Sequence, residues 1–208
     1  MSVNTSRLQA RVILLTGPSG SGKSRLAART GLPVLRLDDF YKNGDDPTLP
    51  RVADGSAVDW DAPASWDQEA AVGAVRTLCE LGSARIPRYD ISLSARVGES
   101  SLCLEGSSLF VAEGIFAAEI VARCGELGLL ADALCLRGRP LTTFRRRLVR
   151  DVREARKPVP VLVRRGWGLM RAEGGIVERH RRLGAHPCAR DEALGRIAAL
   201  RQRSAVGT

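Results

Sequence analysis

The sequence predicts an α/β fold with a mainly parallel sheet, and two kinds of observation support this fold class. Short apolar segments alternate along the chain with longer segments that suit helices, a pattern typical of a parallel sheet covered by helices. The 208 residues, 44% of them apolar and 26% charged, resemble those of ordinary globular proteins with a core of their own. We therefore expect a single domain over residues 1–208.

The elements of the first 60 residues follow from local composition. Residues 11–16 are apolar and β-branched and end at a glycine, which predicts a buried strand. Residues 25–29 are helix formers. Residues 33–38 form a second apolar run that ends in carboxylates, which predicts another strand. Residues 40–60 are rich in Asp, Pro and Gly, and we expect a loop there.

The middle of the chain predicts two helices and two further strand regions. Residues 65–81 begin with helix-capping side chains and end before a glycine, so we expect a helix. Residues 84–104 alternate weakly and predict a hairpin-like excursion. The apolar residues 108–112 predict a strand, and residues 117–130 suit a helix.

The last third of the chain begins with an apolar strand over 131–136 and a basic helix over 140–156 with proline at its start. Prolines break this helix, and two or three more helices are expected up to residue 200. Residues 204–208 are expected to fray.

Composition excludes several classes of protein. No apolar run approaches the about 18 residues of a membrane-spanning helix, and the first residues do not form a secretory signal, so we expect a cytoplasmic protein with no membrane partner. The five cysteines lack metal-binding spacing and are expected to be structural thiols, of which Cys188 comes nearest to a reactive setting. His180 and His186 also lack ligand spacing, and we expect surface or capping roles for them.

Between an expected strand and an expected helix, residues 17–24 satisfy the phosphate-loop pattern G-x-x-x-x-G-K-S. Glycines let the main-chain amides turn inward around an anion, and the following helix dipole favours phosphate. The Lys23 ammonium would reach the β- and γ-phosphates, and the Ser24 hydroxyl would ligate Mg²⁺. The nucleotide would be ATP, with GTP open. The candidate nucleotide-binding residues are Gly17, Pro18, Ser19, Gly20, Ser21, Gly22, Lys23, Ser24 and Arg25.

Acidic side chains stand at the ends of two expected strands, where parallel sheets bind ligands. Asp38 could accept the proton of an attacking hydroxyl group, or it could cap a turn. Glu113 could hold Mg²⁺ or its water shell, or lie in solvent. Four of the nine aromatic residues lie beside Asp or Pro in loop regions, where they suit stacking on a base or sugar, with core filling as the alternative. They are Phe40, Tyr41, Trp60 and Tyr89.

Phosphate loops occur in kinases, motors, GTPases and helicases. The chain has no base-reading N-K-x-D motif and is small for a motor or helicase, so a metabolite kinase is the default expectation. The expected architecture is then a P-loop NTPase three-layer αβα sandwich with an arginine-rich helical lid at about residues 140–165.

Six elements in matching order resemble the uridine/cytidine kinase family of P-loop nucleoside kinases, which are related to phosphoribulokinase and bacterial pantothenate kinase. The resemblance covers about residues 10 to 158. Its elements are the phosphate loop, Asp38-Asp-Phe-Tyr41, Asp59-Trp60-Asp61-Ala-Pro63, Pro87-Arg-Tyr89-Asp90 with Arg96, Val111-Ala-Glu113-Gly-Ile115 and Arg146-Arg147-Leu-Val-Arg150-Asp151.

The resemblance implies roles for these residues. Asp38 would deprotonate the sugar hydroxyl, and Glu113 would serve the metal beside Ser24. Arg147 and Arg150 would reach the nucleotide phosphates, with Lys157 at the lid. The implied acceptor-site residues are Asp38, Tyr41, Trp60, Asp61, Tyr89 and Arg96.

The chain also departs from the family pattern. Ser94 stands where the family usually has a histidine that contributes to recognising the pyrimidine, and at least one lid arginine has shifted. The acceptor therefore stays open among nucleosides, pantothenate-like compounds and sugars. The oligomeric state also stays open.

Positive charge is concentrated in residues 137–182, which carry 15 basic and 4 acidic residues against a net charge of +9 for the whole chain. A lid that contacts phosphates is one interpretation, and a solvated surface is another. A third is a non-catalytic ATP-binding regulator that docks a polyanion, but no nucleic-acid-binding fold is recognisable, so a nucleic-acid partner is not expected.

Overall fold

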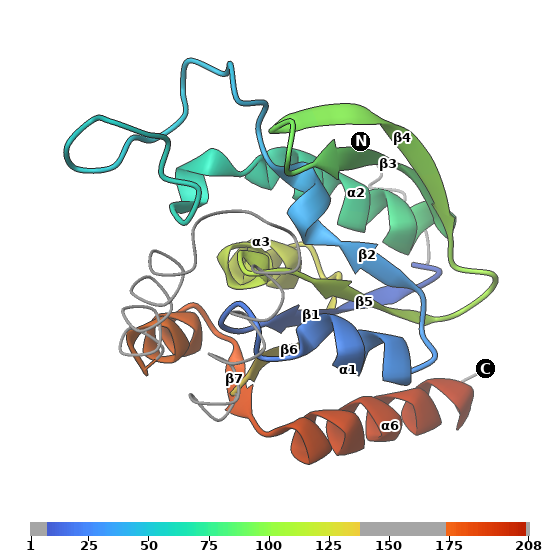
Figure 1. Cartoon of the computed structure of the whole chain (residues 1–208). Coiled ribbons are helices and arrows are strands. Elements are labelled where there is room, and N and C mark those ends of the chain that lie inside the picture. Colours follow the sequence, from blue (N-terminus) through green and yellow to red (C-terminus); the bar gives the residue numbers. More distant parts are fainter. Residues whose placement is uncertain (1–7, 138–173, 207–208) are drawn as a thin grey trace.

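The computed structural model describes residues 8–137 and 174–206. A five-stranded sheet lies at the centre, in the order β2-β5-β1-β6-β7, and every neighbouring pair is parallel (Figure 1). The strands are β1 (Arg11–Thr16), β2 (Val34–Arg36), β5 (Leu109–Glu113), β6 (Leu130–Leu136) and β7 (His186–Cys188). Because all five run the same way, their carboxyl ends meet at one edge of the sheet.

Helices cover both faces of this sheet because strand side chains alternate between two apolar clusters. Val12 and Leu14 of β1 point into the cluster under α2 (Gln68–Leu81) and α3 (Val121–Glu126). Ile13 and Leu15 point into the cluster under α1 (Lys23–Arg29) and α6 (Arg190–Val206). The result is a three-layer α/β arrangement, with α1 and α6 on one side of the sheet in Figure 1.

The chain between β2 and α2 passes over the carboxyl edge of the sheet. It contains the short 3-10 helices η1 (Leu37–Phe40) and η2 (Pro63–Ser65), with a long irregular segment between them. The Asp67 carboxylate accepts the Ala70 amide and caps α2, and Gly82 ends α2 in the left-handed conformation with a φ of 71°.

A two-stranded antiparallel hairpin follows α2, formed by β3 (Ser83–Asp90) and β4 (Ala95–Cys103). It lies outside the central sheet, next to α2 (Figure 1). Most β4 side chains are exposed, including that of Cys103, whereas the other four cysteines are buried. The expected hairpin excursion over residues 84–104 is confirmed. Cys188, which came nearest to a reactive setting in the sequence, is buried beside β6, as expected of a structural thiol.

Several expected boundaries differ in the structure. The second strand ends at Arg36, so Asp38 and Asp39 lie in η1 rather than in a strand. The helix expected over 117–130 is divided into η3 (Ala117–Ile120) and α3, and α3 ends at Glu126, shortly before Gly128 turns the chain with a φ of 69°. Strand β7 was not expected, and α6 continues to Val206, beyond the residue where we expected fraying to begin.

The structure also describes a helix over residues 174–182, between β6 and β7 in the chain. The expected basic helix over 140–156 and the lid at about 140–165 lie outside the described residues. Within the described ranges, no helix has the length and apolar character needed to cross a membrane.

Candidate phosphate and acceptor site

The phosphate loop connects the carboxyl end of β1 to α1, as expected. Three of its residues adopt positive φ angles, 138° at Gly17, 80° at Gly20 and 97° at Gly22, which glycine tolerates best. A side chain at Gly17 would also place its Cβ 2.5 Å from the Leu136 carbonyl oxygen of β6. The loop therefore leaves β1 through a space that only glycine fits.

Lys23 is the first residue of α1, and its side chain turns back over the loop. The residue is 7% exposed. Its Nζ donates hydrogen bonds to the carbonyl oxygens of Gly17 at 2.9 Å and Pro18 at 3.2 Å. The ammonium is therefore held beside the loop amides, where it could bind a phosphate group.

Glu113 ends β5, the strand beside β1, and is 6% exposed. Burial raises the pKa of its carboxyl group, and the Ser24 hydroxyl and the Lys23 charge oppose this shift. A hydroxyl and a carboxylate are oxygen donors of the kind that Mg²⁺ prefers, and Mg²⁺ usually keeps waters and binds through few protein groups. Ser24 and Glu113 therefore fit a magnesium ion that is shared with phosphates. Among the described residues, no group of three or more His, Cys, Asp and Glu side chains could hold a metal by itself.

Asp38 lies in η1, directly after β2, which is one strand away from β1. Its Oδ1 accepts the amide of Ile115 at 3.4 Å, so the carboxylate lies against the residues that follow β5. Gly114 permits this approach, because a Cβ there would lie 3.0 Å from the same oxygen. The negative charge of Asp38 contributes to raising the pKa of Glu113, which places both acids at one edge of the sheet.

An aromatic cluster forms around Tyr41 beside Asp38. The Tyr41 ring centroid lies 5.8 Å from that of Trp60, 5.7 Å from that of Tyr89 and 5.9 Å from that of Phe116. Its hydroxyl donates to the Trp60 carbonyl oxygen at 3.2 Å. Burial raises the pKa of Tyr41, and the nearby charges of Asp38 and Asp61 raise it further. The structure thus brings five of the six candidate acceptor-site residues together: Asp38, Tyr41, Trp60, Asp61 and Tyr89.

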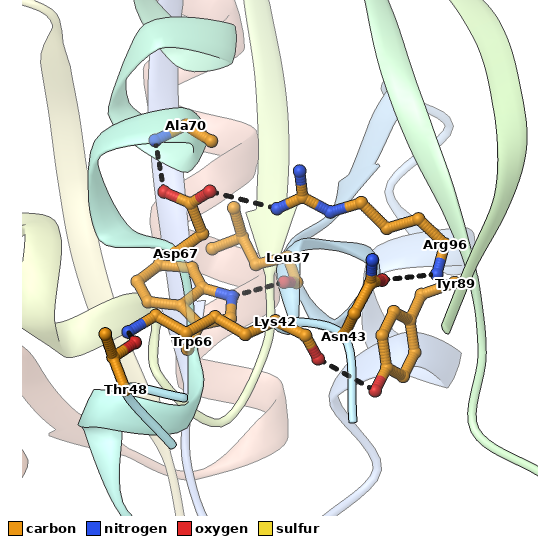
Figure 2. Close-up of polar contacts among 9 residues, drawn as sticks. All are labelled: Leu37, Lys42, Asn43, Thr48, Trp66, Asp67, Ala70, Tyr89 and Arg96. Carbon is orange, nitrogen blue, oxygen red and sulfur yellow. Dashed lines mark hydrogen bonds and ion pairs between the residues drawn. The ribbon is translucent and has the colours of Figure 1, made fainter. Parts of the chain in front are cut away.

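The hairpin is fixed to the segment after β2 by polar contacts, shown in Figure 2. The Tyr89 hydroxyl donates to the Lys42 carbonyl oxygen at 3.1 Å. The Arg96 amide donates to Asn43 Oδ1 at 2.9 Å, and its guanidinium pairs with the Asp67 carboxylate at 3.0 Å. Arg96, the sixth candidate acceptor-site residue, is therefore bound to the residue that caps α2.

The start of α2 is fixed to η1 in the same region. The Trp66 indole Nε1 donates to the Leu37 carbonyl oxygen at 2.7 Å, and both residues are buried (Figure 2). Asn43, Trp66 and Asp67 were not identified from the sequence as parts of the site. Asp67 carried a signal only as a helix cap, and its pairing with a residue 29 positions later has no local sequence signal.

Comparisons with known proteins bear on the fold. No protein-family model matches the sequence, and no curated protein is significantly similar to it. One similar solved structure is described as a fructose transport system kinase from Silicibacter sp. TM1040. It has a TM-score of 0.60 and 17% identity, and the alignment covers 86% of this chain and 88% of that one. With the parallel sheet and its two helical layers, this similarity confirms the expected three-layer α/β fold.

Two further structures align with lower scores. A structure assigned to uridine kinase from Bacillus stearothermophilus has a TM-score of 0.45 and 19% identity, with 65% of this chain and 74% of that chain covered. The YGR205w protein has a TM-score of 0.48 and 17% identity, with 88% and 86% covered.

The remaining candidate residues have different placements. Arg25 is exposed on α1, whereas Ser21 is buried within the loop. Ser94 adopts a φ of 49° at the hairpin turn, and its side chain opposes the rise that burial causes in the pKa of Tyr89. Arg147 and Arg150 lie outside the described residues, as does Lys157.

The histidine expectation is wrong for one of the two histidines. His186 is exposed and pairs with Glu192 at 3.0 Å. His180 is 3% exposed and lies in the core behind the phosphate loop. The expectation rested on the absence of ligand spacing around His180, but its helix turns this side chain inward.

A cavity of about 510 Å³ lies between α2 and the hairpin, away from the phosphate loop. Phe40 and Arg96 contribute to its wall together with small residues of α2. No residue of the loop lines it, so we place the candidate phosphate chemistry outside this cavity.

Proposed function

We propose that the protein is a phosphotransferase that moves the γ-phosphoryl group of Mg-ATP to a hydroxyl group of a small molecule. One observation carries this proposal. Lys23, Ser24 and Glu113 are gathered beside the phosphate loop, and Asp38 lies close enough to Glu113 to affect its pKa. A phosphate-binding cation, two oxygen donors for a metal and a candidate base thus share one edge of the sheet.

On the nucleotide side, the loop amides and the Lys23 ammonium would bind the β- and γ-phosphates. The Ser24 hydroxyl and the Glu113 carboxylate would hold Mg²⁺, which neutralises phosphate charge when it is bound. The burial of Lys23 and Glu113 supports this assignment, because electrostatic interactions are stronger where water is excluded.

On the acceptor side, Asp38 would accept the proton of the attacking hydroxyl group as the oxygen approaches the γ-phosphorus. The contact with the Ile115 amide would hold the carboxylate in position. By the family resemblance, Arg147 and Arg150 would neutralise charge that develops on the transferred group. These two arginines are proposed on sequence grounds alone.

We favour a nucleoside-like acceptor related to uridine or cytidine. The support is the aromatic cluster of Tyr41, Trp60 and Tyr89 beside Asp38, because aromatic rings next to polar groups suit a base and a sugar. Ser94, which stands where the family usually has histidine, is near enough to Tyr89 to oppose the rise that burial causes in its pKa, so base selection would differ from that of the family.

A sugar-type acceptor is the second candidate. It is supported by the solved structure with a TM-score of 0.60, which carries the name of a fructose transport system kinase. A monosaccharide would also suit a site that combines aromatic rings with the carboxylates of Asp38 and Asp61.

A coupled assay of ADP release across an acceptor panel tests these proposals. The panel contains nucleosides, monosaccharides and pantothenate, each with Mg-ATP. We expect a nucleoside to raise ADP release well above the rate with ATP alone. Stimulation by a sugar alone would select the second candidate. ATP binding without stimulation by any member would contradict both and favour a regulatory ATP-binding protein.

A further inference from the structure

His180 is a buried titratable residue to which the proposed reaction assigns no role. It belongs to the helix over residues 174–182, far in sequence from the phosphate loop, and is 3% exposed. Most buried polar side chains in proteins have at least one hydrogen-bond partner. The partners of His180 are therefore informative.

The His180 ring contacts β1, from which the phosphate loop departs, and the neighbouring strand β6. Its Nδ1 lies 3.2 Å from the Thr16 hydroxyl oxygen, at the last residue of β1, and 3.7 Å from the Cys135 sulfur of β6. Thr16 immediately precedes Gly17, the residue that has no room for a side chain against Leu136. His180 thus lies behind the first residue of the loop.

The Thr16 hydroxyl links this histidine to the strand that carries Glu113. Its oxygen lies 3.3 Å from the Ile115 carbonyl oxygen, to which it can only donate. Since the hydroxyl has one proton, the His180 tautomer with hydrogen on Nδ1 completes the chain, from His180 to Thr16 and from Thr16 to Ile115. Ile115 also donates its amide to Asp38.

The helix over residues 174–182 has further anchors on the same side of the molecule. Arg179 pairs with Glu119 of η3 at 2.8 Å, and Val177 packs against the core beside α2 and α3. The Ala185 amide donates to the His180 carbonyl oxygen at 3.0 Å. These contacts hold the histidine in place, so its ring can fix the position of Thr16.

We propose that His180 is a positioning residue for the phosphate loop, acting through the Thr16 hydroxyl on the residue from which the loop departs. The proposal rests on the proposed function, because it requires that the loop binds a nucleotide. A core histidine that only stabilises the fold would affect unfolding but would leave nucleotide affinity of the folded protein unchanged. The two roles are therefore separable by experiment.

The test is calorimetric titration of the full chain with Mg-ATP, together with thermal unfolding of each variant. We expect His180→Leu and Thr16→Val to weaken Mg-ATP affinity by about tenfold, the typical effect of one lost hydrogen bond. His180→Asn can still donate an N–H to Thr16 and should retain most of the affinity. Ser107→Ala is the matched control, since it removes a partly buried hydroxyl that bonds Leu109 at the opposite edge of the sheet.

Unchanged affinity in Thr16→Val or in folded His180→Leu, with only a lower unfolding temperature, would overturn the proposal. An asparagine variant as weak as the leucine variant would overturn it too. If His180→Leu does not fold, Thr16→Val alone decides. If the wild-type chain itself gives no heat with Mg-ATP, the proposed function fails first and the positioning role falls with it, an outcome distinct from the others.

Discussion

On the phosphate side of the candidate site, the loop leaves a strand that is hydrogen-bonded to parallel neighbours on both sides and buried under helices on both faces. On the acceptor side, the chain from η1 to α2 and the hairpin lie outside the sheet. They are joined by side-chain contacts such as Arg96 to Asp67 and Tyr89 to Lys42, and by a main-chain hydrogen bond from the Gly44 amide to the Ser94 carbonyl oxygen at 2.7 Å.

This difference indicates how well each side of the candidate site should tolerate amino-acid substitutions. The loop of the phosphate side is formed by eight consecutive residues that begin in a closely packed frame, so we expect substitutions at its buried positions to disturb the anion-binding arrangement. On the acceptor side, side-chain contacts join residues that are far apart in the sequence: Arg96 contacts Asp67, 29 positions away, and Asn43, 53 positions away. Each of these contacts can be removed by a single substitution. Under the proposed function, acceptor choice could therefore diverge while phosphate chemistry is kept, in line with Ser94 at the position where the family that the sequence resembles usually has histidine.

Lys23→Ala should have the largest effect and abolish phosphotransfer, because it removes the buried ammonium over the loop. Arg29→Ala, an exposed change on the same helix, is the control and should leave turnover near the wild-type rate. Both are measured by the coupled ADP-release assay. An active Lys23→Ala enzyme would refute the phosphate assignment.

Asp38→Asn should reduce turnover by about 10² or more while Mg-ATP affinity is kept, because it removes the base but not the phosphate-binding groups. Asp39→Asn tests the neighbouring carboxylate, which contacts the Tyr89 amide at 3.4 Å. We expect a much smaller loss there. If Asp39→Asn is the more damaging change, the base has been assigned to the wrong acid.

Acidification should destabilise the phosphate side through His180. Burial lowers the pKa of His180 to about 4 from an ordinary value of 6.5, and the charges of Arg179 and Lys23 contribute. Between these pH values the unfolded chain binds a proton that the folded chain does not, so stability falls as pH falls through this range and is complete above it.

The contribution of His180 to the free energy of unfolding should therefore decrease by about 2 kcal/mol between pH 7 and pH 5. Urea unfolding of the wild type and His180→Asn at both pH values measures it, and the variant should lose less stability. His186→Asn, at the exposed histidine, is the control. Equal losses in the wild type and His180→Asn would contradict the prediction.

Asp67→Ala should have the smallest effect, about 1–2 kcal/mol of stability, because it removes a helix cap and a partly exposed ion pair. We also expect a higher KM for the acceptor with an unchanged KM for ATP, since the hairpin loses a contact. Glu80→Ala, which breaks the Arg76 pair on the same helix, should change neither constant. A raised KM for ATP in Asp67→Ala would show that the two sides are coupled.

The parts of the fold that the sequence predicts are those encoded by continuous segments of the chain. The strand, glycine-rich loop and helix around Lys23 form one continuous segment, and the apolar strand before Glu113 is equally local. Strand β7 was missed because its three residues include a proline and extend only by pairing with β6. Such pairing is a tertiary effect that a short segment does not encode.

In the candidate site, too, residues within short motifs could be predicted, whereas contacts that depend on tertiary structure could not. Asp38 and Tyr41 were identified from one short motif, whereas the Arg96 contact with Asp67 depends on how the hairpin lies against α2. A surface or capping role was expected for His180 because the sequence shows no ligand spacing around it. A usable signal was present, since Val177 lies three residues earlier on the same helical face and packs against the core.

The exposed Cys103 at the end of β4 has a practical consequence. Burial raises the pKa of the other four thiols, to about 12 at Cys79 and about 11 at Cys124, Cys135 and Cys188, so they are both shielded and protonated near neutral pH. A maleimide dye should consequently attach at one position of the natural chain, opposite Ser83 in the hairpin. Its fluorescence would report whether the hairpin shifts against α2 when a small molecule binds, without any requirement for turnover.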